Sequence, residues 1–247
     1  MKKTMSMLVN PRMAADGFRK SHWLTVMVMC LSFSCGLTMF SSLQNAALGV
    51  ESLGMVSLVF DLAYLVTALA AVFFIWRLKS AGAADSFRKA GTASLALGLV
   101  LLLTVFALVV LYFSIYSVMA GLTDEQMAEM EMGKEFVEHS WSLLPFIIMS
   151  LVCNALEGVS FLLFRRTLNR LGDMTAGKLP STGVFTGCSV AAALTGGMVL
   201  GRMLFEIMAG GTVLRVVFQV FSCLVEAGIF AGMMLLCQGT LSALRGE

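Results

Sequence analysis

The sequence predicts an all-α integral membrane protein, a polytopic bundle of six transmembrane helices. Of its 247 residues, 58% are hydrophobic and 13% are charged, whereas soluble domains have roughly 45–50% apolar and about 25% charged residues. Charge-free runs cover residues 23–50, 90–123 and 179–201. A helix needs about 20 apolar residues to cross the hydrocarbon core of a bilayer, and the helices of a soluble bundle must keep a polar face. These runs therefore indicate a multi-pass membrane protein.

The six spans follow in order from apolar runs that short polar loops separate. We predict spans at about residues 23–43, 52–76, 90–119, 140–164, 182–207 and 213–237. A basic lead-in of residues 1–22 precedes the first span, and no small-residue cleavage site follows where a signal peptide would have one, so the first span is expected to be retained. No loop is long enough for a second domain, so residues 1–247 are expected to form a single transmembrane domain.

An acidic segment, residues 123–139, separates the third span from the fourth. Thr123 and Gln126 have the spacing of a helix capping box. In such a helix Met127 and Met130 would lie on one side, against the membrane surface. The segment is therefore predicted to be a short amphipathic helix outside the membrane.

The positions of Lys and Arg predict the orientation of the chain. If the N-terminus lies in the cytoplasm, all of the 17 basic residues but Lys134, Arg202 and Arg215 fall on the cytoplasmic side. This is the asymmetry of the positive-inside rule, and it alternates correctly through the loops. Both termini are therefore predicted to be cytoplasmic, and a compact chain with short loops favours a bacterial plasma membrane.

Small residues in the last two spans predict close helix packing. Glycines four residues apart let membrane helices approach closely. The favoured interpretation is that spans 5 and 6 pack against each other inside one chain, and the alternative is a homodimer seam or a sliding helix. The glycines concerned are Gly183, Gly187, Gly197, Gly201, Gly228 and Gly232.

Three acidic residues within the spans, Asp61, Glu157 and Glu226, are the strongest functional signal. An acid at the centre of a bilayer costs at least ~2.5 kcal/mol, so such residues usually face a bundle interior or a wet cavity. At ~1.5 Å per residue they lie about 14, 26 and 20 Å, respectively, from the outer ends of their spans. The three acids are thus staggered in depth and are expected to line one path.

Each of these acids has polar neighbours at helical spacing, which places them on a common helix face. No Lys or Arg is predicted at mid-depth beside them, because Arg202 and Arg215 lie near the outer ends of their helices. Unpaired acids at this depth are expected to be neutral at rest, to exchange protons or to coordinate a cation. The alternative is that each acid only ties helices together by a hydrogen bond. The candidate path residues are Asp61, Tyr64, Asn154, Glu157, Gln219 and Glu226.

Several classes of function lack their sequence motifs. The chain has no HExxH motif for a zinc protease and no Walker A loop. Its only histidines, His22 and His139, lie at span edges. Its six cysteines form no CxxC pair, and no basic tract indicates nucleic acid. We therefore expect neither an enzyme nor a metal or other cofactor, although an enzyme that uses a carboxylate pair stays open as a third choice.

The sequence best fits a membrane transport protein, or a permease subunit, that moves a cation, a proton-coupled solute or a lipid-like substrate. Six spans in about 250 residues is also the size and topology of permease subunits that work with a cytoplasmic ATPase, an analogy that no residue motif supports. In that case the loop with Arg165, Arg166, Arg170 and Lys178 would dock the ATPase. The alternative is a membrane scaffold or sensor whose small-residue helix faces bind partners or a second copy of the chain.

Overall fold

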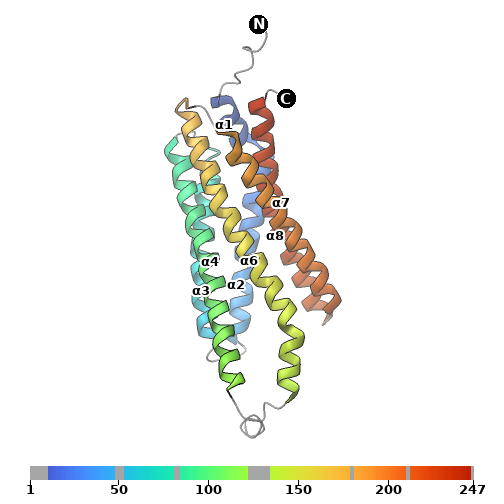
Figure 1. Cartoon of the computed structure of the whole chain (residues 1–247). Helices are drawn as coiled ribbons and strands as arrows, with labels where there is room; N and C mark the ends of the chain where they lie inside the picture. The colour runs from blue at the N-terminus through green and yellow to red at the C-terminus, as the bar shows by residue number, and fades with distance from the viewer. Residues whose placement is uncertain are drawn as a thin grey trace.

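A computed structural model describes residues 11–47, 53–80, 84–121, 134–178, 181–209 and 212–245. Within these ranges the chain forms seven helices and no strand (Figure 1). Six of the helices are long and apolar enough to span a membrane, which confirms the predicted fold class. The helices are α1 (Pro11–Lys20), α2 (His22–Ala47), α3 (Leu53–Arg77), α4 (Ala84–Ala120), α6 (Lys134–Thr175), α7 (Thr182–Ala209) and α8 (Val213–Arg245).

The predicted spans match α2, α3 and α7 within a few residues, but three helices extend well beyond their apolar runs. Helix α4 begins at Ala84 and α8 continues to Arg245. Helix α6 runs from Lys134 to Thr175, so the predicted loop of residues 165–181 is helical over most of its length. The apolar-run criterion missed these ends because they are amphipathic rather than continuously apolar.

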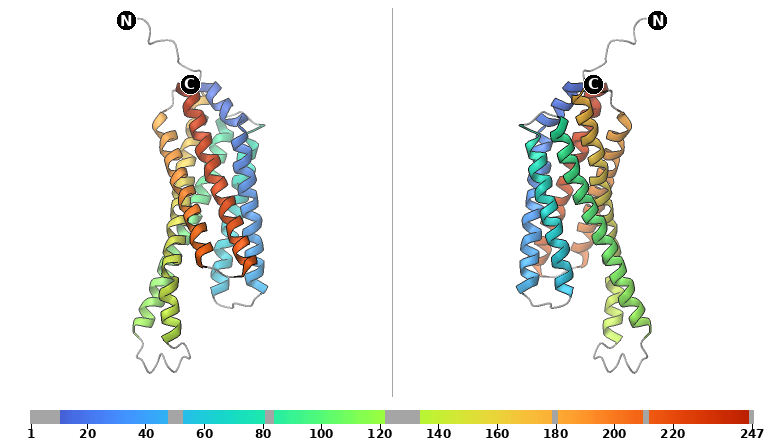
Figure 2. Two further views of the ribbon diagram at one scale, coloured as in Figure 1. Left: turned by 90° about the vertical axis from the view of Figure 1, so that its right-hand side faces the viewer. Right: turned by 90° about the vertical axis from the view of Figure 1, so that its left-hand side faces the viewer.

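The acidic segment predicted to form a separate outer helix mostly falls on residues 122–133, which lie outside the described residues. Its last residues, 134–139, belong to the first turns of α6. At the C-terminal end of α4 and the N-terminal end of α6, these two helices extend past the ends of α2 and α3 (Figure 2).

The six spanning helices form a closed ring. Each packs against two neighbours, in the cyclic order α2, α3, α4, α6, α7, α8 and back to α2. Helix α1 and the C-terminal end of α8 lie at one end of the ring, as Figure 1 shows. We call this end, which also carries most of the Lys and Arg residues, the basic end, and the other the opposite end. The arrangement agrees with an even number of membrane crossings.

The buried core occupies the half of the bundle near the basic end. Among the side chains that the structure describes, the buried apolar ones on α4 run from Phe87 to Leu101, and those on α6 begin at Cys153. On α7 and α8 they likewise end at Val199 and begin at Cys223. In the opposite half the helices diverge, with α7 and α8 leaning away from α4 and α6 (Figure 1). The bundle is therefore tightly packed at the basic end and looser at the opposite end.

Helix α1 covers part of the basic end and was not predicted from the sequence, which indicated only a basic lead-in. Its apolar face, Ala14, Ala15 and Phe18, is buried against α6 and α8. The Phe18 ring lies 6.4 Å from the ring of Phe87 and 6.3 Å from that of Phe164. Through Phe18, helix α1 thus packs against both α4 and α6 at the basic end of the bundle.

Glycines bring α4 and α6 into close contact. A Cβ atom added at Gly98 would lie 2.8 Å from the carbonyl oxygen of Gly158, and one at Gly158 would lie 3.0 Å from that of Gly98. Real Cβ atoms do not approach backbone so closely, so both positions require glycine. The contact holds α4 and α6 together as one hairpin.

Glycines also join α8 to α2, which closes the ring. A Cβ atom added at Gly228 would lie 2.7 Å from Sγ of Cys30, and one at Gly232 would lie 2.9 Å from Cβ of Met27. Close packing at these two predicted glycines is therefore present, but with α2 as the partner rather than with the preceding span.

Helix α6 ends in a turn that only glycine adopts without strain. Gly177 has φ of 86°, in the left-handed region that costs other residues energy. The N–H groups of Ala176 and Lys178 donate to the carbonyl oxygen of Asp173, which satisfies a backbone group at the helix end. This turn fixes where α6 stops and α7 begins.

Candidate functional site

Three charged side chains from three neighbouring helices lie near one another inside the bundle. Arg202 of α7 donates a short hydrogen bond to Oε2 of Glu226 on α8 and forms an ion pair with it. Glu157 of α6 is 8% exposed and lies close enough to interact electrostatically with both. We call Glu157, Arg202 and Glu226 the charged cluster.

The charged cluster contains one more acid than base. Arg202 is engaged by Glu226, and its guanidinium also lies 3.6 Å from Sγ of Cys223. Ser222 donates a hydrogen bond of 3.2 Å to Oε1 of Glu226. Oε1 of Glu157 is buried and has no hydrogen-bond partner among the described residues. With both acids ionised the cluster carries one uncompensated negative charge, which a proton or a monovalent cation would balance.

Side chains from the rest of the ring surround the charged cluster. The Tyr64 hydroxyl of α3 shares a hydrogen bond of 2.9 Å with Ser34 of α2, and Tyr64 lies in the neighbourhood of Glu157 and Glu226. Cys153 lies one helical turn before Glu157 on α6 and is fully buried. The cluster and its surroundings thus draw on five of the six spanning helices.

The charged cluster lies at the border between the tight and the loose half of the bundle. Glu157 follows Cys153, the first buried side chain described on α6, and Arg202 follows Val199, the last on α7. Tyr64 similarly precedes Ala68, the first buried side chain described on α3. Apolar packing therefore separates the cluster from the basic end, and much less of it separates the cluster from the opposite end.

The prediction that the acids have no basic partner at mid-depth is wrong for Glu226. By its position Arg202 lies about 10 Å from the end of α7, and long basic side chains in a membrane usually reach toward the nearer surface. Here the side chain reaches the other way, to Glu226. The nearby Glu226 carboxylate explains this direction, because pairing removes two unpaired charges from a poorly solvated site.

Asp61 lies apart from the charged cluster. Its carboxylate accepts a hydrogen bond of 2.7 Å from Ser42 of α2, nearer the opposite end. Asn154 and Gln219 are half-buried, and in the ranges that the structure describes no hydrogen bond joins either of them to the acids. Of the six predicted path residues, the structure therefore brings together Tyr64, Glu157 and Glu226.

The glycines of α7 do not make the contacts that were predicted for them. Gly183, Gly187 and Gly197 are exposed, and no other described part of the molecule lies within 4 Å of a Cβ atom added there. At Gly201 such an atom would lie 3.3 Å from Cε of Met149 on α6. Spans 5 and 6 do pack against each other, as α7 and α8, but not through these glycines, and α7 presents Gly183, Gly187 and Gly197 on its exposed side.

The residues predicted to form a docking loop are mostly helical. Arg165, Arg166 and Arg170 lie on the last turns of α6, and Lys178 follows the helix. Arg170 and Lys178 make ion pairs of 3.7 and 3.6 Å with Asp173, whose side chain also lies 3.9 Å from Arg88 of α4. Arg170 and Lys178 therefore form part of an ion-pair network at the basic end.

Among the described residues no three His, Cys, Asp or Glu side chains gather in a way that would hold a metal ion. Comparison of the chain with protein-family models, with curated proteins and with solved structures found no match.

Proposed function

We propose that this chain is a membrane transport protein that moves a cation or a proton-coupled solute through the interior of its helix ring. The charged cluster carries the proposal. A buried carboxyl oxygen without a partner is costly in a membrane protein and is typical of ion pathways and proton relays. We place the protein in a bacterial plasma membrane, with both termini in the cytoplasm, because of its positive-inside charge pattern and its short loops.

The mechanism that we propose uses the surplus acid. Glu157 binds a proton or a monovalent cation, while Arg202 holds the Glu226 side chain in place through their ion pair. The loose packing of the opposite half supports access to the charged cluster from outside. Movement of α7 and α8 against the glycine-joined hairpin of α4 and α6 would then expose the cluster to the cytoplasm, as in transporters whose binding site lies near the bilayer midplane.

The test is flux through purified protein reconstituted into liposomes, driven by a pH gradient and, in parallel, by a gradient of Na⁺ or K⁺. We expect Glu157→Gln and Glu226→Gln each to reduce flux by at least about tenfold, in the range seen when a positioned proton-transfer group is lost. Asp85→Asn is the matched control, because Asp85 is an exposed acid paired with Lys89 at 2.7 Å. Full flux in both cluster variants would contradict the proposed pathway.

The alternative function, a membrane scaffold, and the permease-subunit form of the transport function each have an observation of their own. The exposed glycines Gly183, Gly187 and Gly197 of α7 form a face suited to another helix, and Arg166 and Arg170 are exposed at the basic end. Purification in mild detergent distinguishes the cases. A co-purifying ATPase would favour the permease subunit, and a homo-oligomer or a membrane partner without flux would favour the scaffold.

A further inference from the structure

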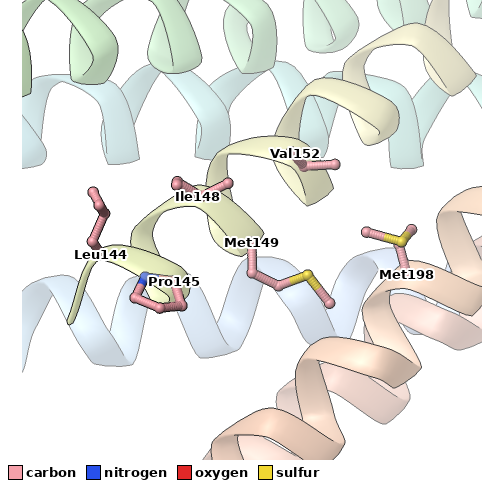
Figure 3. Close-up of a pocket in the computed structure, with 6 residues that line it drawn as sticks. All are labelled: Leu144, Pro145, Ile148, Met149, Val152 and Met198. Carbon is pink, nitrogen blue, oxygen red and sulfur yellow. The ribbon is translucent and has the colours of Figure 1, made fainter. Parts of the chain in front are cut away.

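An apolar pocket lies between α6 and α7 in the loose half of the bundle (Figure 3). Its volume is about 360 Å³. Figure 3 shows the side chains of Met149 and Met198 reaching from the two helices into the space between them. The lining residues are Leu144, Pro145, Ile148, Met149, Val152 and Met198.

The pocket adjoins the charged cluster. Met149, Cys153 and Glu157 are four residues apart and therefore share one face of α6, over a length of about 12 Å. Cys153 lies in the electrostatic field of Arg202, Glu157 and Glu226. On α7, Gly201 directly precedes Arg202. A Cβ atom added at Gly201 would lie 3.3 Å from Cε of Met149 on α6. The apolar pocket and the charged cluster are therefore consecutive along both helices.

The apolar pocket and the charged cluster favour different chemical groups of one ligand. The pocket offers only apolar side chains, which suit a hydrocarbon or aromatic group. The charged cluster has one acid in excess, with Oε1 of Glu157 unpartnered, and so favours one positive charge. An anionic lipid would add negative charge beside Glu157, and a small hydrated cation would leave the pocket unused.

We infer that the pocket and the charged cluster form one binding site for an amphiphilic monocation. Its apolar part lies between Met149 and Met198, and its positive group lies against Glu157. This inference rests on the proposed transport function and names its substrate class. Methionine side chains are flexible and polarisable, so they accommodate apolar groups of different shape.

The experiment measures equilibrium binding of radiolabelled tetraphenylphosphonium to the full chain in nanodiscs, with the signal of empty nanodiscs subtracted. Decyltrimethylammonium is expected to displace the label, and the uncharged decanol at the same concentration is not. Glu157→Gln removes the negative charge, and Met198→Trp fills the pocket. Each change is expected to weaken binding by at least about tenfold.

Two variants serve as matched controls. Leu194→Trp places the same bulk one turn away on α7, where Leu194 is 60% exposed, and Asp85→Asn removes an exposed acid. Both are expected to bind as the unsubstituted protein does. Val152→Trp fills the pocket from α6 and replaces Met198→Trp if that variant elutes as an aggregate in size-exclusion chromatography.

Three outcomes would overturn the inference. They are the absence of saturable binding, equal binding by Glu157→Gln, and displacement by decanol as effective as by the cation. The last two would mean that the pocket holds only bilayer hydrocarbon. Because binding is measured without a gradient, its failure alongside normal proton or cation flux would reject the substrate class and leave the transport proposal standing.

Discussion

Arg202 balances the charges of the buried cluster. It forms an ion pair with Glu226 and lies near Glu157, one oxygen of which has no hydrogen-bond partner among the described residues. Removing one member of a buried ion pair typically costs about 3–5 kcal/mol, because the other charge is left uncompensated. Arg202 is therefore expected to matter for stability as well as for the proposed transport.

We predict that Arg202→Gln lowers the thermal denaturation midpoint of the detergent-purified protein more than Glu157→Gln does. The Arg202 variant leaves two acids facing each other without a base, whereas the Glu157 variant leaves the ion pair with Glu226 intact. The double variant Arg202→Gln/Glu226→Gln removes both charges of the pair and should recover part of the loss. A midpoint of the Arg202 variant at or above that of Glu157→Gln would contradict this assignment.

The acids of the charged cluster were predictable from the sequence, but their partners were not. Glu157 and Glu226 stand out because an acid within an apolar run has an identifiable cost wherever the helix lies. The pairing of Arg202 with Glu226 depends on which helices are neighbours and on how each is rotated. The separation of Asp61 from the cluster depends on the same information, which one-dimensional spacing does not contain.

At the scale of single helices, glycine contacts define the rigid part of the fold. Gly98 and Gly158 place α4 and α6 in backbone contact, whereas Gly183, Gly187 and Gly197 of the α7 GxxxG pattern are exposed. Helices α7 and α8 do pack together as predicted, but the pattern identified the wrong residues for that contact, because it reports only that a face is small. It does not report which neighbour, if any, lies against that face.

We predict that Gly98→Ala destabilises the protein by about 1–3 kcal/mol, as overpacking of a close contact does. The added Cβ would meet the carbonyl oxygen of Gly158 at 2.8 Å, and backbone at a helix crossing cannot move away cheaply. Gly187→Ala is the control, since its Cβ would meet nothing within 4 Å among the described atoms. Alanine is also the better helix former, by about 1 kcal/mol. Denaturation followed by circular dichroism distinguishes the two variants.

Helix α1 has sequence features typical of a helix, but the strongly apolar span that follows made them easy to overlook. Pro11 is the first helical residue, where proline is favoured, and Ala14, Ala15 and Phe18 have helical spacing. Ten residues form only a marginal helix alone, and a strongly apolar span follows directly. Its stability comes from Phe87 and Phe164, which lie far away in the sequence.

We predict that Phe18→Ala lowers the stability of the purified protein by about 3–5 kcal/mol, the usual cost of removing a buried phenylalanine. Met13 lies on the outer face of α1 and is 68% exposed, so Met13→Ala should change stability by about 0.5 kcal/mol or less. The comparison uses denaturation midpoints in the same detergent. Equal midpoints would show that α1 does not depend on its contacts with α4 and α6.

At the scale of the whole molecule, the number of spans was predictable and their arrangement was not. Long apolar runs identify membrane helices because the bilayer imposes a minimum length. The cyclic order of the helices, the tight basic end and the loose opposite end arise from contacts between distant parts of the chain. The orientation in the membrane follows from charge and stays a prediction.

We predict that a membrane-impermeant maleimide labels Thr212→Cys but not Ser80→Cys in intact cells. Both side chains are exposed, and they lie at opposite ends of the ring. Breaking the membrane should allow both to be labelled, and the unsubstituted protein, whose described cysteines are buried or half-buried, sets the background. Labelling of Ser80→Cys alone in intact cells would reverse the predicted orientation.

The contact of α2 with α8 has a consequence for the biosynthesis of the protein. The first span cannot complete its packing until the last span is synthesised, because Met27 and Cys30 on α2 pack against Gly232 and Gly228 of α8. At the usual 5–20 residues per second, about 200 residues separate these helices by roughly 10–40 s of translation. During that interval one face of α2 meets lipid or the insertion machinery, and for the last 24 residues of it, about 1–5 s at this rate, the nascent chain also holds Arg202 without Glu226. Completion of α8 therefore closes the ring and also supplies the Glu226 carboxylate that balances the charge of Arg202.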